Sequence, residues 1–188
     1  MATVQAPITL TPAQYFETAY TKLQKENSTL NKFALPKIEK ICINVGIGKL
    51  FDNKQKQQIV EYLTNLTGQK PKLIITRKSI SGFKVRSGDV VGAILTLRGK
   101  KMQDFLFNLI YIALPRTRDF RGIKTSSFDN NYSCYSLGIP ASSIFPAIGF
   151  DADINFGIQI NISFKHSGKA NFDFLNYLSF PFSKIITK

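Results

Sequence analysis

Apolar residues alternate with polar ones in some stretches of this chain and recur at helical spacing in others. Ile41, Ile43, Val45 and Ile47 have polar residues or glycine between them, which predicts a strand with one buried face. Further strands are predicted over residues 72–76, 93–98 and 154–164, the last being the longest alternation in the chain. Helical spacing predicts helices over residues 11–26, 53–66, 101–114 and 169–178.

The ends of these helices carry recognisable signals. Thr11 can cap the first helix, Pro12 suits its first position, and Gln14 completes a capping box. Gly68 stands where a left-handed cap would end the second helix, and Pro115 ends the third. These local signals support the helical boundaries independently of the apolar pattern.

The order of these elements predicts an α+β fold. Strands interrupted by helices of this length favour a mostly antiparallel sheet with helices packed on one face and an open polar face. Between the second and third strands, residues 77–92 are rich in turn-forming and basic residues and predict a protruding loop. We expect an N-terminal arm and helix over residues 1–34, one domain over residues 35–182, and a tail over residues 183–188.

The charge of the chain points to a polyanionic partner. Its 25 Lys and Arg against 12 Asp and Glu give a net charge of +13, which favours nucleic acid over a membrane surface. No apolar stretch is long enough to span a bilayer, no basic amphipathic helix supports peripheral membrane binding, and no transit or secretory signal is evident. Two distant cysteines and a single histidine predict reduced thiols, no metal and no cofactor.

The chain lacks the usual signatures of an enzyme. Gly46, Gly48 and Lys49 suggest a phosphate-binding loop, but Leu50 stands where such a loop needs Ser or Thr. His166 has no catalytic partner in a recognisable motif, so we expect neither catalysis nor a small-molecule substrate. The alternative is a metal-dependent RNA-processing nuclease that uses Asp151 and Asp153, although solvated loop acids are the simpler interpretation.

Two basic segments are candidates for phosphate contacts. Residues 77–88 contain four cations, one aromatic residue and two glycines without an acid, and a solvated hairpin is as good an interpretation as an RNA contact. Residues 115–122 place Arg116, Arg118 and Arg121 after a buried helix. On the open face, Asn44, Thr96 and Arg98 suggest recognition of structured RNA without aromatic stacking, or else they are ordinary strand residues facing water.

Several strings of residues, in a fixed order, resemble one protein family. They are Lys40 to Gly48 (KICINVGIG), Thr67 to Pro71 (TGQKP), Arg77 to Arg86 (RKSISGFKVR), Thr96 to Gly99 (TLRG), Pro115 to Gly122 (PRTRDFRG), Ile144 to Pro146 (IFP) and Phe180 to Phe182 (FPF). Together they resemble the bacterial-type family of ribosomal large-subunit protein five, which binds 5S rRNA, and the resemblance covers roughly residues 35–182. The chain departs from the family pattern in its first 34 residues and in residues 129–143, which are bulkier than the usual glycine-rich connection.

The resemblance implies a scaffold that anchors 5S rRNA to 23S-type rRNA in the central protuberance and so supports translation. Asn44, Gln69 and Thr96 stand at the family's 5S rRNA-contacting positions, with Arg98 beside them, and Arg116, Arg118 and Arg121 are candidates for other rRNA contacts. Other implied partners are P-site tRNA and small-subunit protein thirteen, on a ribosome in the bacterial cytoplasm or alternatively in an organellar matrix. The residues expected to approach P-site tRNA are Arg77, Lys78, Ser79, Gly82, Phe83, Lys84 and Arg86.

Overall fold

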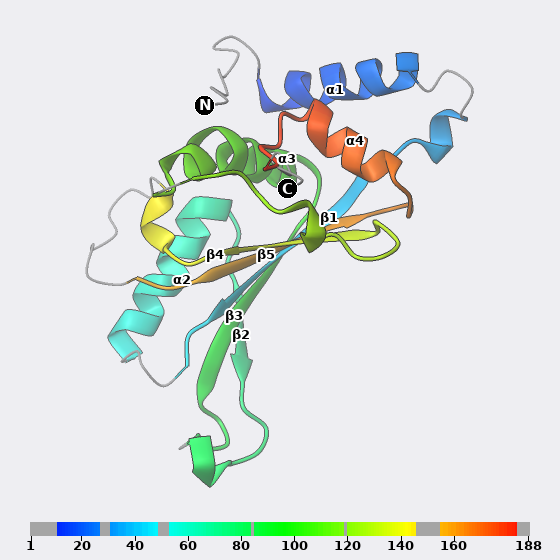
Figure 1. The fold of residues 1–188 in the computed structure, drawn as a ribbon. Helices are drawn as coiled ribbons and strands as arrows, with labels where there is room; N and C mark the ends of the chain where they lie inside the picture. The colour runs from blue at the N-terminus through cyan, green and yellow to red at the C-terminus, as the bar shows by residue number, and fades with distance from the viewer. Residues whose placement is uncertain are drawn as a thin grey trace.

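A computed structural model describes residues 11–26, 31–48, 53–83, 85–118, 120–145 and 155–183. Its centre is a five-stranded antiparallel sheet in the order β2-β3-β1-β5-β4, with the helices on one face, which confirms the predicted α+β fold (Figure 1). The strands are β1 (Ile38–Gly46), β2 (Lys72–Ile75), β3 (Val90–Leu97), β4 (Cys134–Ile139) and β5 (Ile158–Phe164). The helices are α1 (Pro12–Glu26), α2 (Asn53–Thr67), α3 (Gly99–Asn108) and α4 (Ala170–Tyr177).

The central strand β1 follows the predicted alternation. Ile41, Ile43 and Val45 are fully buried, and the residues between them face away from the helices. The strand pairs with β3 on one side and β5 on the other, and both partners bury the same face. The helix-side face of the sheet therefore forms the floor of the hydrophobic core, and the opposite face is left open.

The first helix begins with the predicted capping box and packs into the same core. The Thr11 N–H donates to Oε1 of Gln14 at 3.0 Å, and the Gln14 N–H donates to Oγ1 of Thr11 at 3.5 Å. Phe16 and Leu23 are buried, and α1 contacts both α3 and α4. The domain boundaries at residues 34 and 182 stay predictions, and residues 1–10 and 184–188 lie outside the described residues.

Several predicted boundaries were wrong, including that of the strand expected from residue 93, which begins at Val90. The helix expected over residues 101–114 begins at Gly99, and its α-helical part ends at Asn108. It continues as a π-helical turn (Leu109–Ala113) and a 3-10 turn (Leu114–Arg116), because the Leu114 N–H bonds five residues back, to Leu109. The strand expected from residue 154 begins at Ile158, since residues 155–157 lie outside the ladder with β4, while residue 154 is outside the described residues.

Strand β4 was not predicted. Its alternation is short, with Tyr135 and Ile139 buried, Leu137 half-buried, and small residues between them. Within the described residues it pairs with one strand, β5, and forms a single bridge from Tyr135 to Phe128; a turn at residues 129–132 leads into it, with Tyr132 at a φ of +53°. Pairing with β5 stabilises this strand more than its own sequence pattern does.

No helix in the described part of the chain is long and apolar enough to cross a membrane.

Candidate nucleic-acid interface

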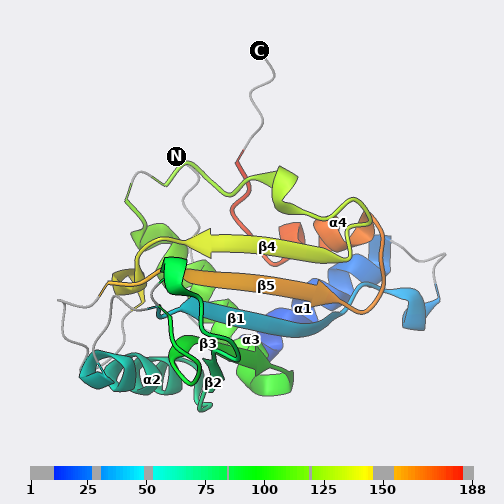
Figure 2. The ribbon, with the colours of Figure 1, turned by 90° about the horizontal axis from the view of Figure 1, so that it is seen from below.

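The open face of the sheet, which Figure 2 views from below, carries mostly polar side chains and one apolar residue, Ile94, on its central rows. Asn44 on β1 lies opposite Ile94 on β3 and Gln159 on β5. Because residues directly opposite in an antiparallel ladder share a face, Asn44 and Gln159 lie on the same side of the sheet. The next row along the strands joins Thr96, Cys42, Asn161 and Ser136.

The structure brings Asn44, Gln69 and Thr96 together on this face. Gln69 follows the end of α2, where Gly68 adopts a φ of +65° and its N–H bonds to the carbonyl of Thr64. From there, Nε2 of Gln69 donates to the carbonyl oxygen of Thr96 at 3.4 Å. The side chain of Thr96 is exposed, and that of Asn44 is half-buried on the neighbouring strand. These polar groups are therefore held by the fold at the surface, where a ligand can reach them.

The guanidinium group of Arg98 forms an ion pair, which the sequence did not predict. Its Nη1 lies 3.2 Å from Oε1 of Glu39, and both side chains are about half exposed, at 58% and 44%. An exposed ion pair of this kind is worth roughly 0.2–1 kcal/mol. An incoming phosphate can thus displace Glu39 at small cost.

Sequence reasoning missed the contribution of β4 and β5 to this surface. Ser136, Gln159 and Asn161 lie on the same face as Asn44, and Nε2 of Gln159 is 3.4 Å from Oδ1 of Asn161. The alternation of residues 155–165 contained this polar row. Only the pairing of β5 with β1 places that row beside Asn44.

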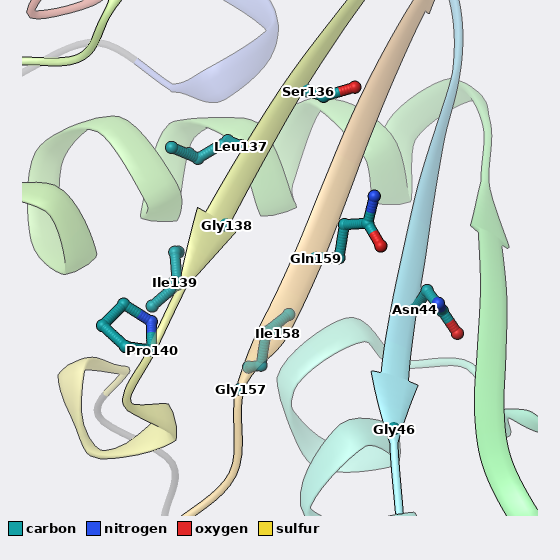
Figure 3. Close-up of a pocket in the computed structure, with 10 residues that line it drawn as sticks. All are labelled: Asn44, Gly46, Ser136, Leu137, Gly138, Ile139, Pro140, Gly157, Ile158 and Gln159. Carbon is teal, nitrogen blue, oxygen red and sulfur yellow. The ribbon is translucent and has the colours of Figure 1, made fainter. Parts of the chain in front are cut away.

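A shallow groove of about 540 Å³ lies over this part of the face. In Figure 3, the side chains of Asn44, Ser136 and Gln159 project to one side of the strands, while Leu137 projects to the other. The groove is also lined by Gly46, Gly138 and Gly157, which leave backbone groups uncovered. Glycine permits close approach of a ligand to the backbone, so the groove suits a sugar-phosphate chain.

A hairpin between β2 and β3 carries the first basic segment away from the body of the protein (Figure 1). Ile80 and Val85 exchange backbone hydrogen bonds of 3.0 and 3.2 Å, which close a 3-10 turn over Ser81–Phe83. Asp89 accepts a hydrogen bond at Oδ2 from the Arg86 N–H at 2.9 Å. The hairpin is therefore an ordered protrusion.

Most residues predicted for the hairpin contact are exposed, whereas Lys84 lies outside the described residues. The exposed ones are Arg77, Lys78, Ser79, Gly82, Phe83 and Arg86.

The second basic cluster lies beyond the opposite edge of the sheet. Arg116, Arg118 and Arg121 are exposed in the segment that follows α3. Phe120 and residues 122–124 of this segment line a second groove together with β4. Gly122 fixes the course of this segment, because it has a φ of +93° and a Cβ there would lie 2.6 Å from backbone atoms of Ser183. The open polar face thus has exposed cations beyond both of its edges.

The described residues hold no group of three or more His, Cys, Asp or Glu side chains that could bind a metal. Asp151 and Asp153, the acids of the nuclease alternative, lie outside the described residues. Among the described residues, the groups with shifted pKa values are tyrosines in the core or packed against it: burial raises the pKa of Tyr20 and of Tyr62 to about 12. Tyr62 is buried in the core and Tyr20 is half-buried against it, so neither belongs to the open face.

Comparison with known proteins gives a consistent result over most of the chain. Residues 31–86 match the family Ribosomal protein L5, and residues 90–182 match the model of the C-terminus of the same ribosomal protein family. The chain is 41% identical to large ribosomal subunit protein uL5 of Colwellia psychrerythraea, over 90% of this chain and 95% of that protein. It is 42% identical to uL5c of Cyanidium caldarium, over 89% and 94%, and 45% identical to uL5 of Lactobacillus acidophilus, over 73% and 77%.

Proposed function

Because the chain belongs to the ribosomal protein L5 family and is a non-enzymatic structural protein of the large ribosomal subunit, we propose that its open sheet face binds 5S rRNA. Its role in translation and its association with rRNA follow from the family, and the nuclease alternative is withdrawn. We further propose that the protein anchors 5S rRNA to 23S-type rRNA in the central protuberance.

The observation that carries the proposal is the gathering of polar side chains on one open face flanked by exposed cations. Asn44, Thr96 and Gln69 present amide and hydroxyl groups that can donate and accept hydrogen bonds, without a stacking aromatic ring among them. Such groups suit the ribose 2′-hydroxyls and phosphates of folded RNA. Cations contribute most of the affinity, and the short polar side chains fix the register of the RNA.

The hydrogen bond between Gln69 and Thr96 determines which group of Gln69 can bind RNA. With Nε2 of Gln69 bound to the carbonyl of Thr96, the amide oxygen of Gln69 is oriented as an acceptor. Arg98, released from Glu39, supplies a cation at the end of the same strand. We propose that these residues and Asn44 form the 5S rRNA contact.

The two basic segments are proposed for different partners. The hairpin projects clear of the sheet and would reach P-site tRNA through Arg77, Lys78, Arg86 and the exposed ring of Phe83. The arginine cluster (Arg116, Arg118 and Arg121) lies beyond the other edge of the sheet and would bind 23S-type rRNA. We also propose that the protein contacts the head of the small subunit through small-subunit protein thirteen.

The location on the ribosome follows from the family. A ribosome of the bacterial cytoplasm is our first proposal, and an organellar ribosome is the alternative. Bacterial uL5 and the uL5c of Cyanidium caldarium match this chain at 41% and 42% identity, respectively.

The proposal is tested by filter binding of the purified protein to 5S rRNA and to a tRNA, with magnesium present. If the protein contacts roughly six to ten phosphates, raising the salt concentration from 50 to 200 mM should lower its affinity for 5S rRNA by a factor of about 10³ to 10⁵. Asn44→Ala and Thr96→Ala should each weaken 5S binding by about three- to tenfold, the value of one hydrogen bond. Asn65→Ala and Thr21→Ala, at exposed positions on the helices, are the matched controls.

Equal binding of both RNAs, or unchanged affinity in both sheet-face variants, would contradict the assignment of the open face. The hairpin is tested separately by reversing Lys78 and Arg86 to Glu, with the same reversals at Lys22 and Lys25 on α1 as the control for net charge. We expect the hairpin variant to lose tRNA affinity and to retain 5S binding. Loss of 5S binding would show that the hairpin had been assigned to the wrong partner.

A further inference from the structure

Exposed apolar side chains are concentrated on one protrusion of this protein. Among the described residues, six large hydrophobic side chains are exposed, and five of them lie on β2 or on the hairpin that follows it. Phosphate contacts explain the cations of this hairpin but not its aliphatic residues. These side chains are Leu73 (40% exposed), Ile74 (38%), Ile75 (56%), Ile80 (49%) and Phe83 (76%), and the sixth is Phe33 (86%).

RNA bound on the open face would leave part of this apolar surface uncovered. Lys72 pairs with Ile94, which in turn pairs with Asn44, so Lys72 lies on the open face. Leu73 pairs with the buried Ala93 and so lies on the opposite side. Alternation along β2 places Ile75 there too, because the one-residue register shift after Ile74 adds its extra residue to β3. No residue of β2 is buried by the helices of its own chain. Leu73 and Ile75 therefore need a different partner.

The two edges of the sheet differ in how they are protected. Beside β4, Phe128 forms a bridge with Tyr135, and the Tyr135 hydroxyl donates to the carbonyl of Lys124 at 3.0 Å. Strand β2 pairs only with β3 and has no neighbouring strand on its outer side within the described chain. An edge that combines unpaired backbone groups with aliphatic side chains is a template for an added strand.

We propose that β2 binds an extended segment of a partner protein, which adds to the sheet as a sixth strand. The segment would alternate aliphatic residues, which cover Leu73 and Ile75, with acidic ones. The acids are expected because exposed cations stand at both ends of β2, namely Lys70 before it, Lys72 at its first position and Arg77 after it. This interaction goes beyond the proposed RNA binding and uses a surface that the RNA-binding face leaves free.

Charge and chemistry disfavour other occupants of this edge. A second copy of the chain would bring the same cations together in a protein that carries a net charge of +13. RNA gains most from stacking surfaces and cations, and the aliphatic side chains of Leu73 and Ile75 offer neither. An acidic, extended protein segment complements both the apolar side chains and the flanking charge.

The test is a fluorescence anisotropy titration of the full chain with a labelled eight-residue peptide of alternating Val and Glu. A peptide of the same composition with its Val residues grouped controls for net charge. A third peptide, N-methylated at alternate residues, cannot complete the backbone ladder. We expect the alternating peptide to bind at least tenfold more tightly than either control, and this comparison uses the unaltered protein.

The protein side is tested by the double variant Leu73→Thr and Ile75→Thr. Threonine keeps a high strand propensity at these exposed positions, so the hairpin should be retained. We expect the peptide to bind this variant at least tenfold more weakly, and to bind Phe33→Thr, which removes an exposed apolar side chain elsewhere, as it binds the unaltered protein. The affinity for 5S rRNA should be unchanged in both variants.

Three outcomes would overturn the proposal. Equal binding of the three peptides would reduce the interaction to non-specific charge attraction. A concentration-dependent dimer that the double variant abolishes would identify a second copy as the occupant of the edge. Loss of 5S rRNA binding in the double variant, with peptide binding unchanged, would assign these side chains to RNA.

Discussion

The buried amide of Asn171 joins two loops, and its loss should destabilise the fold measurably. Asn171 is 2% exposed in the first turn of α4. Its Nδ2 donates two hydrogen bonds of 2.6 Å, to the carbonyls of Tyr132 and His166. The first carbonyl belongs to the turn before β4, and the second follows β5. One side chain therefore ties the start of β4 and the end of β5, which lie at the same end of the β4–β5 ladder, to α4.

The magnitude follows from these two bonds. Each neutral hydrogen bond contributes about 0.5–1.5 kcal/mol net, so Asn171→Ala should lower the free energy of unfolding by about 1–3 kcal/mol. Asn171→Asp should cost more, because an ionised carboxylate would face two carbonyl oxygens in a buried site. Burial and those oxygens would raise the pKa of that carboxyl in the folded protein above its unfolded value. The extra loss should therefore shrink as the pH falls and the carboxyl becomes protonated.

Urea denaturation followed by circular dichroism measures these changes, because the chain has no tryptophan. Asn131→Ala, an exposed position in the neighbouring turn, is the matched control and should change the free energy of unfolding by less than about 0.5 kcal/mol. An Asn171→Ala variant as stable as the control would refute the role of the amide. So would an Asp variant that is no less stable than the Ala variant at neutral pH.

Two further predictions concern the hairpin and the core. Asp89→Ala removes the acceptor of the hydrogen bond from the Arg86 N–H. Trypsin should then cleave within the hairpin several-fold faster, while the midpoint of urea denaturation stays the same. An unchanged cleavage rate would mean that the other hydrogen bonds are sufficient to hold the hairpin. Burial raises the pKa of Tyr62 from 10.0 to about 12, so the stability that depends on its neutral form is present below pH 10 and is lost between about pH 10 and 12. Denaturation at pH 9 and 11.5 should show this loss, and an equal loss in Tyr62→Phe would assign it to other groups.

Much of the sheet and of the candidate RNA surface was predictable from local pattern. The alternation through Ile41, Ile43 and Val45 predicts β1 and assigns Asn44 to the polar face, because successive strand residues point to opposite sides. The capping box at Thr11 and the glycine at Gly68 predict helix ends, since both act within a few residues. The basic hairpin and the arginine cluster are equally visible as runs of charge.

Other features depend on contacts between distant segments. β4 is recognisable mainly through its pairing with β5, and that pairing adds Ser136 to the polar face, while the pairing of β5 with β1 adds Gln159. The contact of Gln69 with Thr96 and the ion pair of Arg98 with Glu39 join residues far apart in the chain. Alternation gives the side to which a residue points, but not which strand lies beside it.

By itself, therefore, the sequence determined the class of fold, the polar side of its central strand and the attraction to a polyanion, all of which depend on short-range spacing or on net charge. Tertiary structure decided the strand order, which leaves β2 as an edge with aliphatic side chains and shields β4 with the segment after α3. The physical reason is that strand pairing satisfies backbone groups between segments of any separation, so its partners are chosen by the packing of the whole core.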